Sequence, residues 1–360
     1  MNEYGLERPM TRRRTGWLSR AAPSRRTRDG RRLLGRARTI RLNLALQGGG
    51  AHGAFTWGVL DRLLETERFR YEGISGTSAG AINAVVFASG WLAEGAAGAG
   101  TNLAELWRGV AEIACALHVS GVPPAALEVA TQLLSPYQLN PFDIDPLRGL
   151  LERLVDFERL RQDRSLKLMI AATALRTGTL RIFENRELSA DAVLASACLP
   201  SLHQAVEIDG EAYWDGGYVS NPPLLPLVER CRARDLLLVR INSRERSALP
   251  MSAGEIRNRV GEIVFDQPLE RELALLKERR GLPAALGTAE RRLARHRLHV
   301  IDGGEVLSSL DPSTKVVPDW DTLQRLRDLG RATAASWLEG TSASSLPDAK
   351  NGHAPLLSAA

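Results

Sequence analysis

Apolar residues along this chain follow two repeating patterns, one typical of strands and one typical of helices. Residues 41–47 alternate Leu42, Leu44 and Leu46 with other residues and run into a glycine cluster, which predicts a strand. Residues 54–67 repeat apolar side chains at intervals of three and four, which predicts a helix. The same patterns predict further strands at 69–74, 166–175, 179–185, 205–214 (a hairpin), 235–241 and 298–302, and further helices ending near 93 and at 102–117, 146–161, 190–200, 254–297 and 321–339.

Strands and helices alternate along most of the chain, which predicts an α/β fold with a largely parallel sheet covered on both faces. Asp209-Gly210 is the expected hairpin turn, and Asp145-Pro146 is an expected helix start. No convincing linker divides residues 41–339, so we expect one domain there. The polar, small-residue segment 340–360 is expected to be a disordered tail.

Charge is distributed unevenly between the first residues and the rest of the chain. The net charge is +5 over 360 residues, yet residues 1–41 alone hold 13 Arg against Glu3, Glu7 and Asp29. The remaining residues therefore carry a net negative charge. We expect residues 1–40 to be a disordered Arg-rich arm, with peripheral contact to an anionic membrane as its candidate function. No nucleic-acid recognition motif accompanies the charge, which argues against a nucleic-acid partner.

Residues 73–93 carry no charged side chain, which raises the question of a membrane span. A span needs about 20 predominantly apolar residues, whereas this stretch begins with a glycine-rich turn and includes Asn83 and Ser89. We therefore interpret it as a buried helix that follows a tight turn. The three cysteines, at positions 115, 198 and 231, form neither a disulfide framework nor a metal pattern, which favours a reducing, cytoplasmic location.

The first candidate site is the stretch "LQGGGAHGAF", which follows the first predicted strand. Gly48, Gly50 and Gly53 match the dinucleotide fingerprint G-x-G-x-x-G. The stretch also fits an oxyanion hole, in which backbone N–H groups at a helix start stabilise a developing anion. The second strand ends at Ile74 without the acidic residue that a dinucleotide site needs, which favours the second interpretation. The candidate oxyanion donors are Gly48, Gly49, Gly50, Ala51 and Gly53.

The second candidate site is "GTSAG", a G-x-S-x-G match at the end of the second strand. A nucleophilic Ser needs this spacing because it sits on a sharp strand-to-helix turn, where Gly76 and Gly80 remove side chains that would collide. The helix dipole then favours a partly anionic oxygen on Ser78. The motif alone also fits a plain turn of small residues.

The third candidate site is Asp215 with Gly216 and Gly217, in "YWDGGYVSNPP". An Asp before glycine is often only a turn or cap residue. Asp209 and Asp302 also precede glycine, and we interpret both as turn residues.

The three motifs, in this order, resemble those of the patatin-like phospholipases. The resemblance spans about residues 41–340 and implies a three-layer α/β/α fold and hydrolysis of lipid acyl esters. We expect no cofactor, and no metal, since His118 and His203 lack partners at the spacing of metal ligands. The resemblance assigns Ser78 and Asp215 as a catalytic dyad, with a lipid or fatty-acyl ester as substrate. The family's glycine-rich loop usually has Arg or Lys where this chain has His52. A fixed positive charge beside the loop is therefore in doubt, and so is the substrate preference.

In the implied mechanism, Ser78 attacks the ester carbonyl and Asp215 takes its proton directly. A carboxylate with an ordinary pKa near 3.9 is a weak base, so the dyad requires that the site partly desolvate Asp215.

Two alternatives remain open from the sequence. His296 and His299 follow Asp215, so a Ser-Asp-His triad of the α/β-hydrolase type has a permitted order, although His296 is expected in a solvated helix. The other alternative is a non-catalytic lipid-binding protein. Residues 113–144 are apolar and contain prolines; we interpret them as ordinary core, with an acyl-chain pocket or lid as the alternative.

Overall fold

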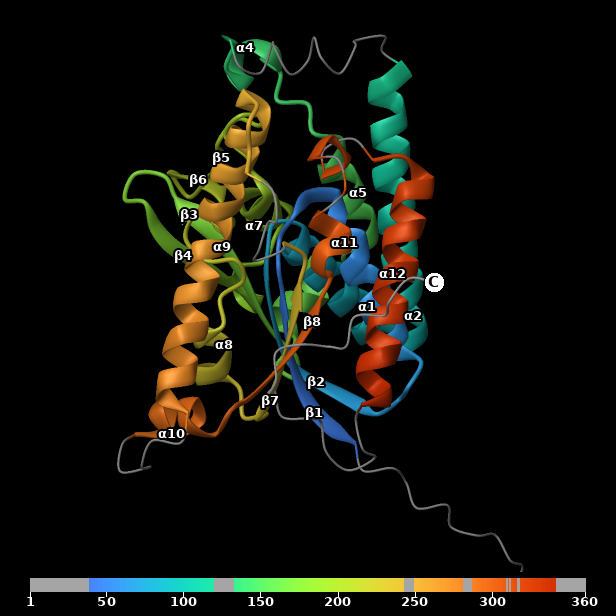
Figure 1. The fold of residues 1–360 in the computed structure, drawn as a ribbon, viewed down its shortest axis with the longest axis vertical. Coiled ribbons are helices and arrows are strands. Elements are labelled where there is room, and N and C mark those ends of the chain that lie inside the picture. Colours follow the sequence, from blue (N-terminus) through green and yellow to red (C-terminus); the bar gives the residue numbers. More distant parts are fainter. Residues whose placement is uncertain are drawn as a thin grey trace, which may run out of the picture. The chain divides into compact units, whose positions relative to one another are not determined.

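A mixed sheet of eight strands lies at the centre of the described residues (Figure 1). The computed structural model describes residues 39–119, 133–242, 249–280, 287–308, 310, 312–315 and 318–340. The strand order is β5-β6-β3-β2-β1-β7-β8, and β4 pairs with β3. The strands are β1 (Ile40–Leu46), β2 (Phe69–Thr77), β3 (Lys167–Ala174), β4 (Thr179–Glu184), β5 (Val206–Ile208), β6 (Glu211–Asp215), β7 (Asp235–Arg240) and β8 (Arg297–Asp302).

Five consecutive strands of this order, from β3 to β8, pair in parallel, whereas β4, β5 and β6 make antiparallel pairs at one side. The prediction of a largely parallel sheet is confirmed. The carboxyl ends of parallel strands meet at one edge of a sheet, where ligands and substrates bind in α/β folds. The glycine-rich loop follows β1 and Ser78 follows β2, so both motifs lie at this edge.

Helices cover both faces of the sheet, which gives the predicted three-layer α/β/α architecture (Figure 1). The alternation of β7 shows the two faces: Leu237 and Val239 belong to the larger core, and Leu236 and Leu238 to the smaller one. The larger core includes α1 (Gly53–Leu64), α2 (Ala79–Val119), α5 (Pro146–Leu154), α6 (Phe157–Gln162), α7 (Ala190–Ala197) and α12 (Trp320–Glu339), and the smaller core includes α8 (Leu225–Arg230), α9 (Ala253–Arg279) and α10 (Thr288–Arg295). The remaining elements are α4 (Pro136–Leu139), α11 (Gly304–Ser308) and the short 3₁₀ turns η1 (Gly50–His52), η2 (Asn185–Glu187), η3 (Gly216–Tyr218) and η4 (Pro312–Lys315).

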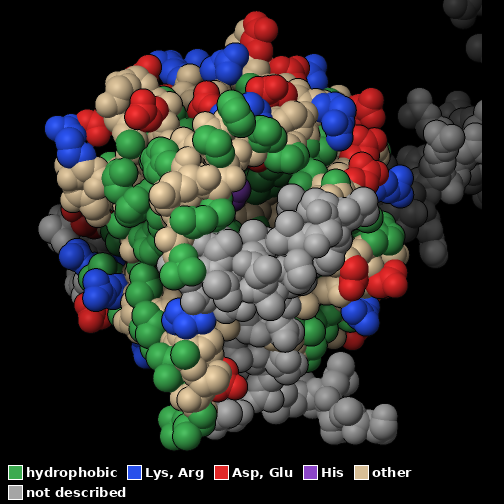
Figure 2. Space-filling view, turned by 90° about the horizontal axis from the view of Figure 1, so that it is seen from above, with side chains coloured by type: hydrophobic (Ala, Val, Ile, Leu, Met, Phe, Trp, Pro, Cys, Tyr) green, Lys and Arg blue, Asp and Glu red, His purple; other side chains and the backbone are tan. Residues whose placement is uncertain are grey.

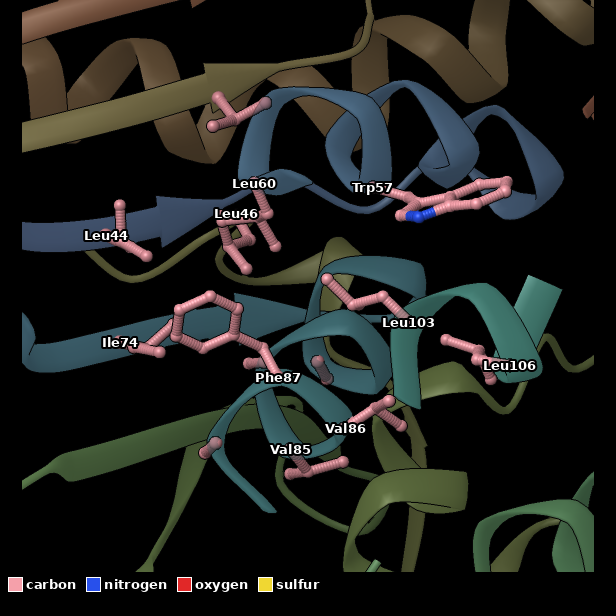
Figure 3. Packing of buried hydrophobic residues seen from close by; sticks show 14 of the residues in the cluster. Leu44, Leu46, Trp57, Leu60, Ile74, Val85, Val86, Phe87, Leu103 and Leu106 are labelled. Atoms are coloured by element: carbon pink, nitrogen blue, oxygen red, sulfur yellow. The ribbon is translucent and has the colours of Figure 1, made fainter. Parts of the chain in front are cut away.

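The uncharged stretch 73–93 is the buried end of β2 and the first part of α2. Figure 3 shows Leu44 of β1, Ile74 of β2 and Phe87 of α2, all completely buried in the larger core. Burial inside the protein accounts for the apolar character of this stretch, as predicted. Within the part of the chain that the structure describes, no helix is long and apolar enough to cross a membrane.

One predicted helix boundary is confirmed and another is wrong. The helix end expected near residue 93 is present, because α2 consists of two helices separated by a kink at Glu94 and Gly95, where the backbone is not helical and Gly95 adopts a positive φ of 64°. The charged helix expected over 254–297 is divided, since α9 ends at Arg279 and α10 begins at Thr288. His296 follows α10 and is buried rather than solvated.

The interpretation of residues 113–144 as ordinary core is wrong for the described part that begins at residue 133. Phe142 is 85% exposed and Ile144 is 68% exposed. The next helix does begin as predicted, because Asp145 caps α5 by accepting from the N–H of Leu147 and Pro146 takes the first helical position.

The predicted hairpin joins β5 and β6. Asp209 and Gly210 both adopt positive φ, at 52° and 78°, as a two-residue hairpin turn requires. The predicted arm (1–40) and tail (340–360) lie outside the described residues, apart from residues 39, 40 and 340. The described residues all fall into one compact unit, which begins at Ala37.

Helices α1 and α12 approach so closely that their contact depends on two glycines. A Cβ atom on Gly58 would lie 1.9 Å from the carbonyl oxygen of Arg327, and one on Gly330 would lie 2.1 Å from that of Phe55. We predict that Gly330→Ala lowers the free energy of unfolding by about 1–3 kcal/mol through overpacking, although Ala favours an isolated helix by about 1 kcal/mol. Urea unfolding measures the effect.

The matched control is Gly149→Ala in α5, where nothing lies within 4 Å of the added Cβ. This variant is expected to gain stability from helix propensity alone. A Gly330→Ala protein as stable as Gly149→Ala would contradict the close contact.

Candidate active site

Ser78 occupies a sharp turn between β2 and α2. Its φ is 54°, in the left-handed region that non-glycine residues rarely adopt. The flanking glycines make this turn possible, because a Cβ on Gly76 would lie 2.5 Å from the carbonyl oxygen of Gly80, and one on Gly80 would lie 2.0 Å from that of Leu46. The N–H of Ser78 donates to Oγ of Ser196 in α7 at 2.9 Å. Ser78 therefore lies on a strand-to-helix turn that leaves no room for a side chain at positions 76 and 80.

Asp215 ends β6 at the same edge of the sheet. Its Oδ1 accepts from the N–H of Gly217 at 2.7 Å, which tightens the Asp-Gly-Gly turn. A Cβ on Gly216 would lie 2.3 Å from the carbonyl oxygen of Ala171, and one on Gly217 would lie 2.2 Å from the ring of Phe265. Both glycines are therefore required by close packing against β3 and α9.

The strand register brings Asp215 and Ser78 together. Asp215 pairs with Ala172 in β3, and the preceding residue, Ala171, pairs with Thr77 in β2. The side chain of Asp215 is completely buried, and Ser78 is 8% exposed. Burial raises the pKa of Asp215 from 3.8 to about 7, against the opposing effects of the Gly217 N–H and the nearby Ser78 hydroxyl. Oδ2 of Asp215 accepts no hydrogen bond of good geometry from the described residues, so Ser78 is a neighbour rather than a tight partner.

The glycine-rich loop lies directly against the nucleophile. A Cβ on Gly48 would lie 2.6 Å from the carbonyl oxygen of Thr77 and 2.7 Å from Cβ of Ser78. The N–H of Gly48 is already used, since it donates to Oδ1 of Asn221 at 2.7 Å.

The N–H groups of the loop divide into used and available donors. The N–H of Gly53 donates to the carbonyl oxygens of Gly50 and Ala51. The first N–H groups of a helical turn have no acceptor within it, and η1 begins at Gly50. Within the described segments, the N–H groups of Gly49, Gly50 and Ala51 at the start of η1 have no hydrogen-bond acceptor.

His52 is buried behind the loop and is neutral at pH 7. Burial, with a smaller effect of nearby Lys315, lowers the pKa of His52 to about 4. Its Nε2 lies 2.8 Å from Oγ1 of Thr314. A cation nevertheless lies beside the loop, because the Lys315 amine donates to Oδ1 of Asn242 at 3.4 Å and is close enough to His52 to lower its pKa. The Lys315 amine lies 3.7 Å from a carboxylate oxygen of Glu262.

A buried polar network supports the loop from behind, and sequence reasoning missed it. Oε1 of Gln47 accepts from the N–H groups of Ile241 and Asn242 at 2.8 and 2.9 Å. Asn242 donates through Nδ2 to the Gly48 carbonyl oxygen at 3.1 Å. Nε2 of Gln47 donates to Asp266, which pairs with Arg240. In the sequence, the one indication that Gln47 supports the loop was its position directly before the glycines.

The two histidines of the alternative triad lie elsewhere. Nε2 of His299 is 2.9 Å from Oδ1 of Asp235, at the start of β7, which is the amino end of a strand parallel to β2. Nδ1 of His296 contacts the Leu293 carbonyl oxygen. Neither ring is hydrogen-bonded to Asp215. Among the described residues, no group of three His, Cys, Asp or Glu side chains is placed to hold a metal ion.

Comparison with known families matches residues 44–228 to the patatin-like phospholipases. The match covers just over half of the 360 residues, so the chain belongs to this family of lipid ester hydrolases. A comparison with curated proteins gives no match.

Two solved structures illustrate the wider similarity. VipD from Legionella pneumophila is 16% identical, over 79% of this chain and 66% of that one, with a TM-score of 0.37. ExoU, in its complex with SpcU from the type III secretion system of Pseudomonas aeruginosa, is 18% identical over 84% of this chain and 60% of that one, with a TM-score of 0.32. The chain thus spans less than two thirds of the length of these structures.

The raised pKa of Asp215 predicts a specific dependence of stability on pH. Between pH 3.8 and about 7 the folded protein retains a proton that the unfolded chain releases, so stability is lost as pH rises through this window.

Asp215→Asn keeps an acceptor for Gly217 but removes the charge. Relative to wild type, we expect this variant to gain up to about 4 kcal/mol in unfolding free energy from pH ~4 to pH ~8. Urea titrations at both pH values measure it, and an identical pH dependence in the two proteins would disprove the burial cost.

Proposed function

We propose that this protein hydrolyses carboxylic esters of lipids through a Ser-Asp dyad, with Ser78 as nucleophile and Asp215 as base. The observation that supports this best is the buried Asp215 carboxyl beside Ser78, whose pKa is raised to about 7. A carboxylate with an ordinary pKa is too weak a base for a hydroxyl at neutral pH, whereas one near 7 is matched to that pH. Desolvation thus supplies the property that the dyad requires.

The proposed reaction has two steps. Ser78 Oγ bonds to the ester carbonyl carbon while its proton passes to Asp215, and the leaving alcohol then takes that proton as its C–O bond breaks. The acyl group remains on Ser78. Water attacks this acyl-enzyme, gives a proton to Asp215, and releases the fatty acid as Ser78 regains its proton.

The N–H groups of Gly49, Gly50 and Ala51 are the proposed oxyanion donors. They lie at the start of η1, and the preceding residue, Gly48, packs closely against the Thr77 carbonyl oxygen and the Cβ atom of Ser78. A single oxyanion donor typically contributes about 3–4 kcal/mol to transition-state stabilisation. The N–H groups of Gly48 and Gly53 have intramolecular acceptors, so we assign them to holding the loop in shape.

The Arg-rich arm is proposed as a second contact with lipid. Its 13 Arg residues within 1–41 favour anionic membranes. Deletion of residues 1–38 should therefore weaken binding to vesicles that contain phosphatidylserine, with the largest loss at low salt. Co-sedimentation measures this, and unchanged binding would remove the arm from the account.

The dyad predicts which side chains are needed for hydrolysis. Ser78→Ala should lose labelling by a fluorophosphonate probe and lower kcat/KM on a panel of esters by more than about 10³-fold, because the nucleophile is removed. His299→Ala and His296→Ala should retain activity per folded molecule. The ester panel also ranks phospholipid, neutral lipid and polyester substrates.

Two outcomes separate the alternatives. A His variant as inactive as Ser78→Ala would favour the Ser-Asp-His triad. Absence of labelling in the wild type at every pH from about 5 to 9 would favour a lipid-binding protein without catalysis, since activation of the nucleophile depends on base ionisation.

A further inference from the structure

Exposed apolar side chains are concentrated in two segments of the chain. Of the 16 large hydrophobic side chains that are exposed in the described residues, 12 belong to residues 133–144 and 249–264. Phe142 is 85% exposed and Met251 is 83% exposed. Scattered single apolar residues are normal on a protein surface, whereas concentrated ones mark an interaction site. We call these two segments together the apolar rim.

The apolar rim lies at the end of the molecule that holds the site. Figure 1 shows α4 and the first half of α9 at the end toward which β1 and β2 point. Figure 2 looks onto this end and shows hydrophobic side chains gathered along one side of a hollow.

Both rim segments are anchored on residues that hold Asp215. Phe265 of α9 packs its ring 4.8 Å from that of Tyr218, in the Asp-Gly-Gly turn. On the other side, Gln204 donates to the carbonyl oxygen of Asn140 at 2.6 Å and accepts from the Cys198 thiol. The carbonyl oxygen of Cys198 in turn accepts from the N–H of Asp215 at 2.8 Å.

The rim residues of α9 form one face of the helix. This face carries four exposed apolar side chains at helical spacing. They are Ile256 and the residues four, seven and eight positions after it: Val260, Ile263 and Val264. The side chain of Leu269, further along, is completely buried in the smaller core. The helix thus exposes an apolar face beside the site and buries another against the sheet.

The charge of the rim points to an uncharged apolar partner. Residues 133–144 contain only Asp143 as a charged residue, and residues 249–264 contain two acidic and two basic residues. A near-neutral, apolar surface gives no electrostatic preference for a polyanion. The family's substrate is itself a lipid, and an acyl ester that reaches Ser78 from a lipid surface avoids passage through water.

We propose that the apolar rim docks on the surface of a lipid bilayer through hydrophobic contact and so places the site over its substrate. This inference rests on the proposed function for the identity of the partner. It differs from the arm's proposed contact, because the rim requires neither anionic lipid nor low salt.

The test measures docking without turnover. The full chain with Ser78→Ala is mixed with phosphatidylcholine vesicles at about 1 M NaCl, where a Debye length of about 3 Å suppresses the arm's attraction. Two further variants each carry one additional substitution in this Ser78→Ala chain, either Ile263→Ser or Phe142→Ser. The matched control is Leu275→Ser, in the same helix, since Leu275 is 42% exposed and Ile263 is 43% exposed. Twelve residues, or about 18 Å along the helix, separate the two positions.

We expect the Ser78→Ala protein to bind these vesicles, with each rim variant weakening the partition at least about tenfold and Leu275→Ser leaving it unchanged. No vesicle binding, or equal weakening by Leu275→Ser, would overturn the inference.

A concentration-dependent dimer that the rim variants abolish, without vesicle binding, would assign the rim to a second copy instead. Because binding is read without hydrolysis, an inactive wild type that still docks would overturn the proposed function alone, and an active wild type that does not dock would overturn the rim alone.

Discussion

The close approach of three backbone segments around Ser78 is the constraint on which the rest of the site depends. The carbonyl oxygen of Leu46 in β1 lies where a side chain on Gly80 would begin, and Gly48 meets Ser78 with no room for a Cβ. At this contact Ser78 adopts a positive φ, and its side chain stays slightly exposed at the carboxyl ends of the strands. The sheet order follows the same requirement, since β1 and β2 must be adjacent for their loops to touch.

Burial of Asp215 is the energetic counterpart of this geometry. The Asp215 carboxyl is completely buried, with one backbone donor on Oδ1 and, among the described residues, none on Oδ2. Its ionised form therefore lowers the stability of the folded protein. The same unfavourable burial raises its pKa into the range of a useful base. Strain and desolvation of this kind are typical of catalytic centres, where they cost stability and supply reactivity.

The motif residues of the site were predictable from the sequence, because each motif encodes its own turn. Glycines at 48, 76, 80 and 216 are each required by a close backbone contact, and Gly217 by the ring of Phe265. The supporting residues were not predictable: Ser196, Asn221 and Asn242 come from distant segments, and a lone Ser or Asn carries no spacing signal. The exposed Phe142 also misled prediction, since apolar residues in a Pro-containing segment usually indicate core. The sequence suggested that His52 removes the positive charge beside the glycine-rich loop. The His52 ring is indeed neutral, but Lys315 from η4 lies beside the loop.

If buried Asp215 activates Ser78, as we propose, the reactivity of Ser78 must follow the ionisation of Asp215. The rate at which a fluorophosphonate probe labels Ser78 is followed against pH in the wild type and in Asp215→Asn. We expect a rate that rises with pH, with a midpoint of about 7 in the wild type, and a slow, nearly pH-independent rate in the variant. A midpoint near the ordinary carboxyl pKa of about 3.9, or a variant that reacts as fast as wild type, would contradict this proposal.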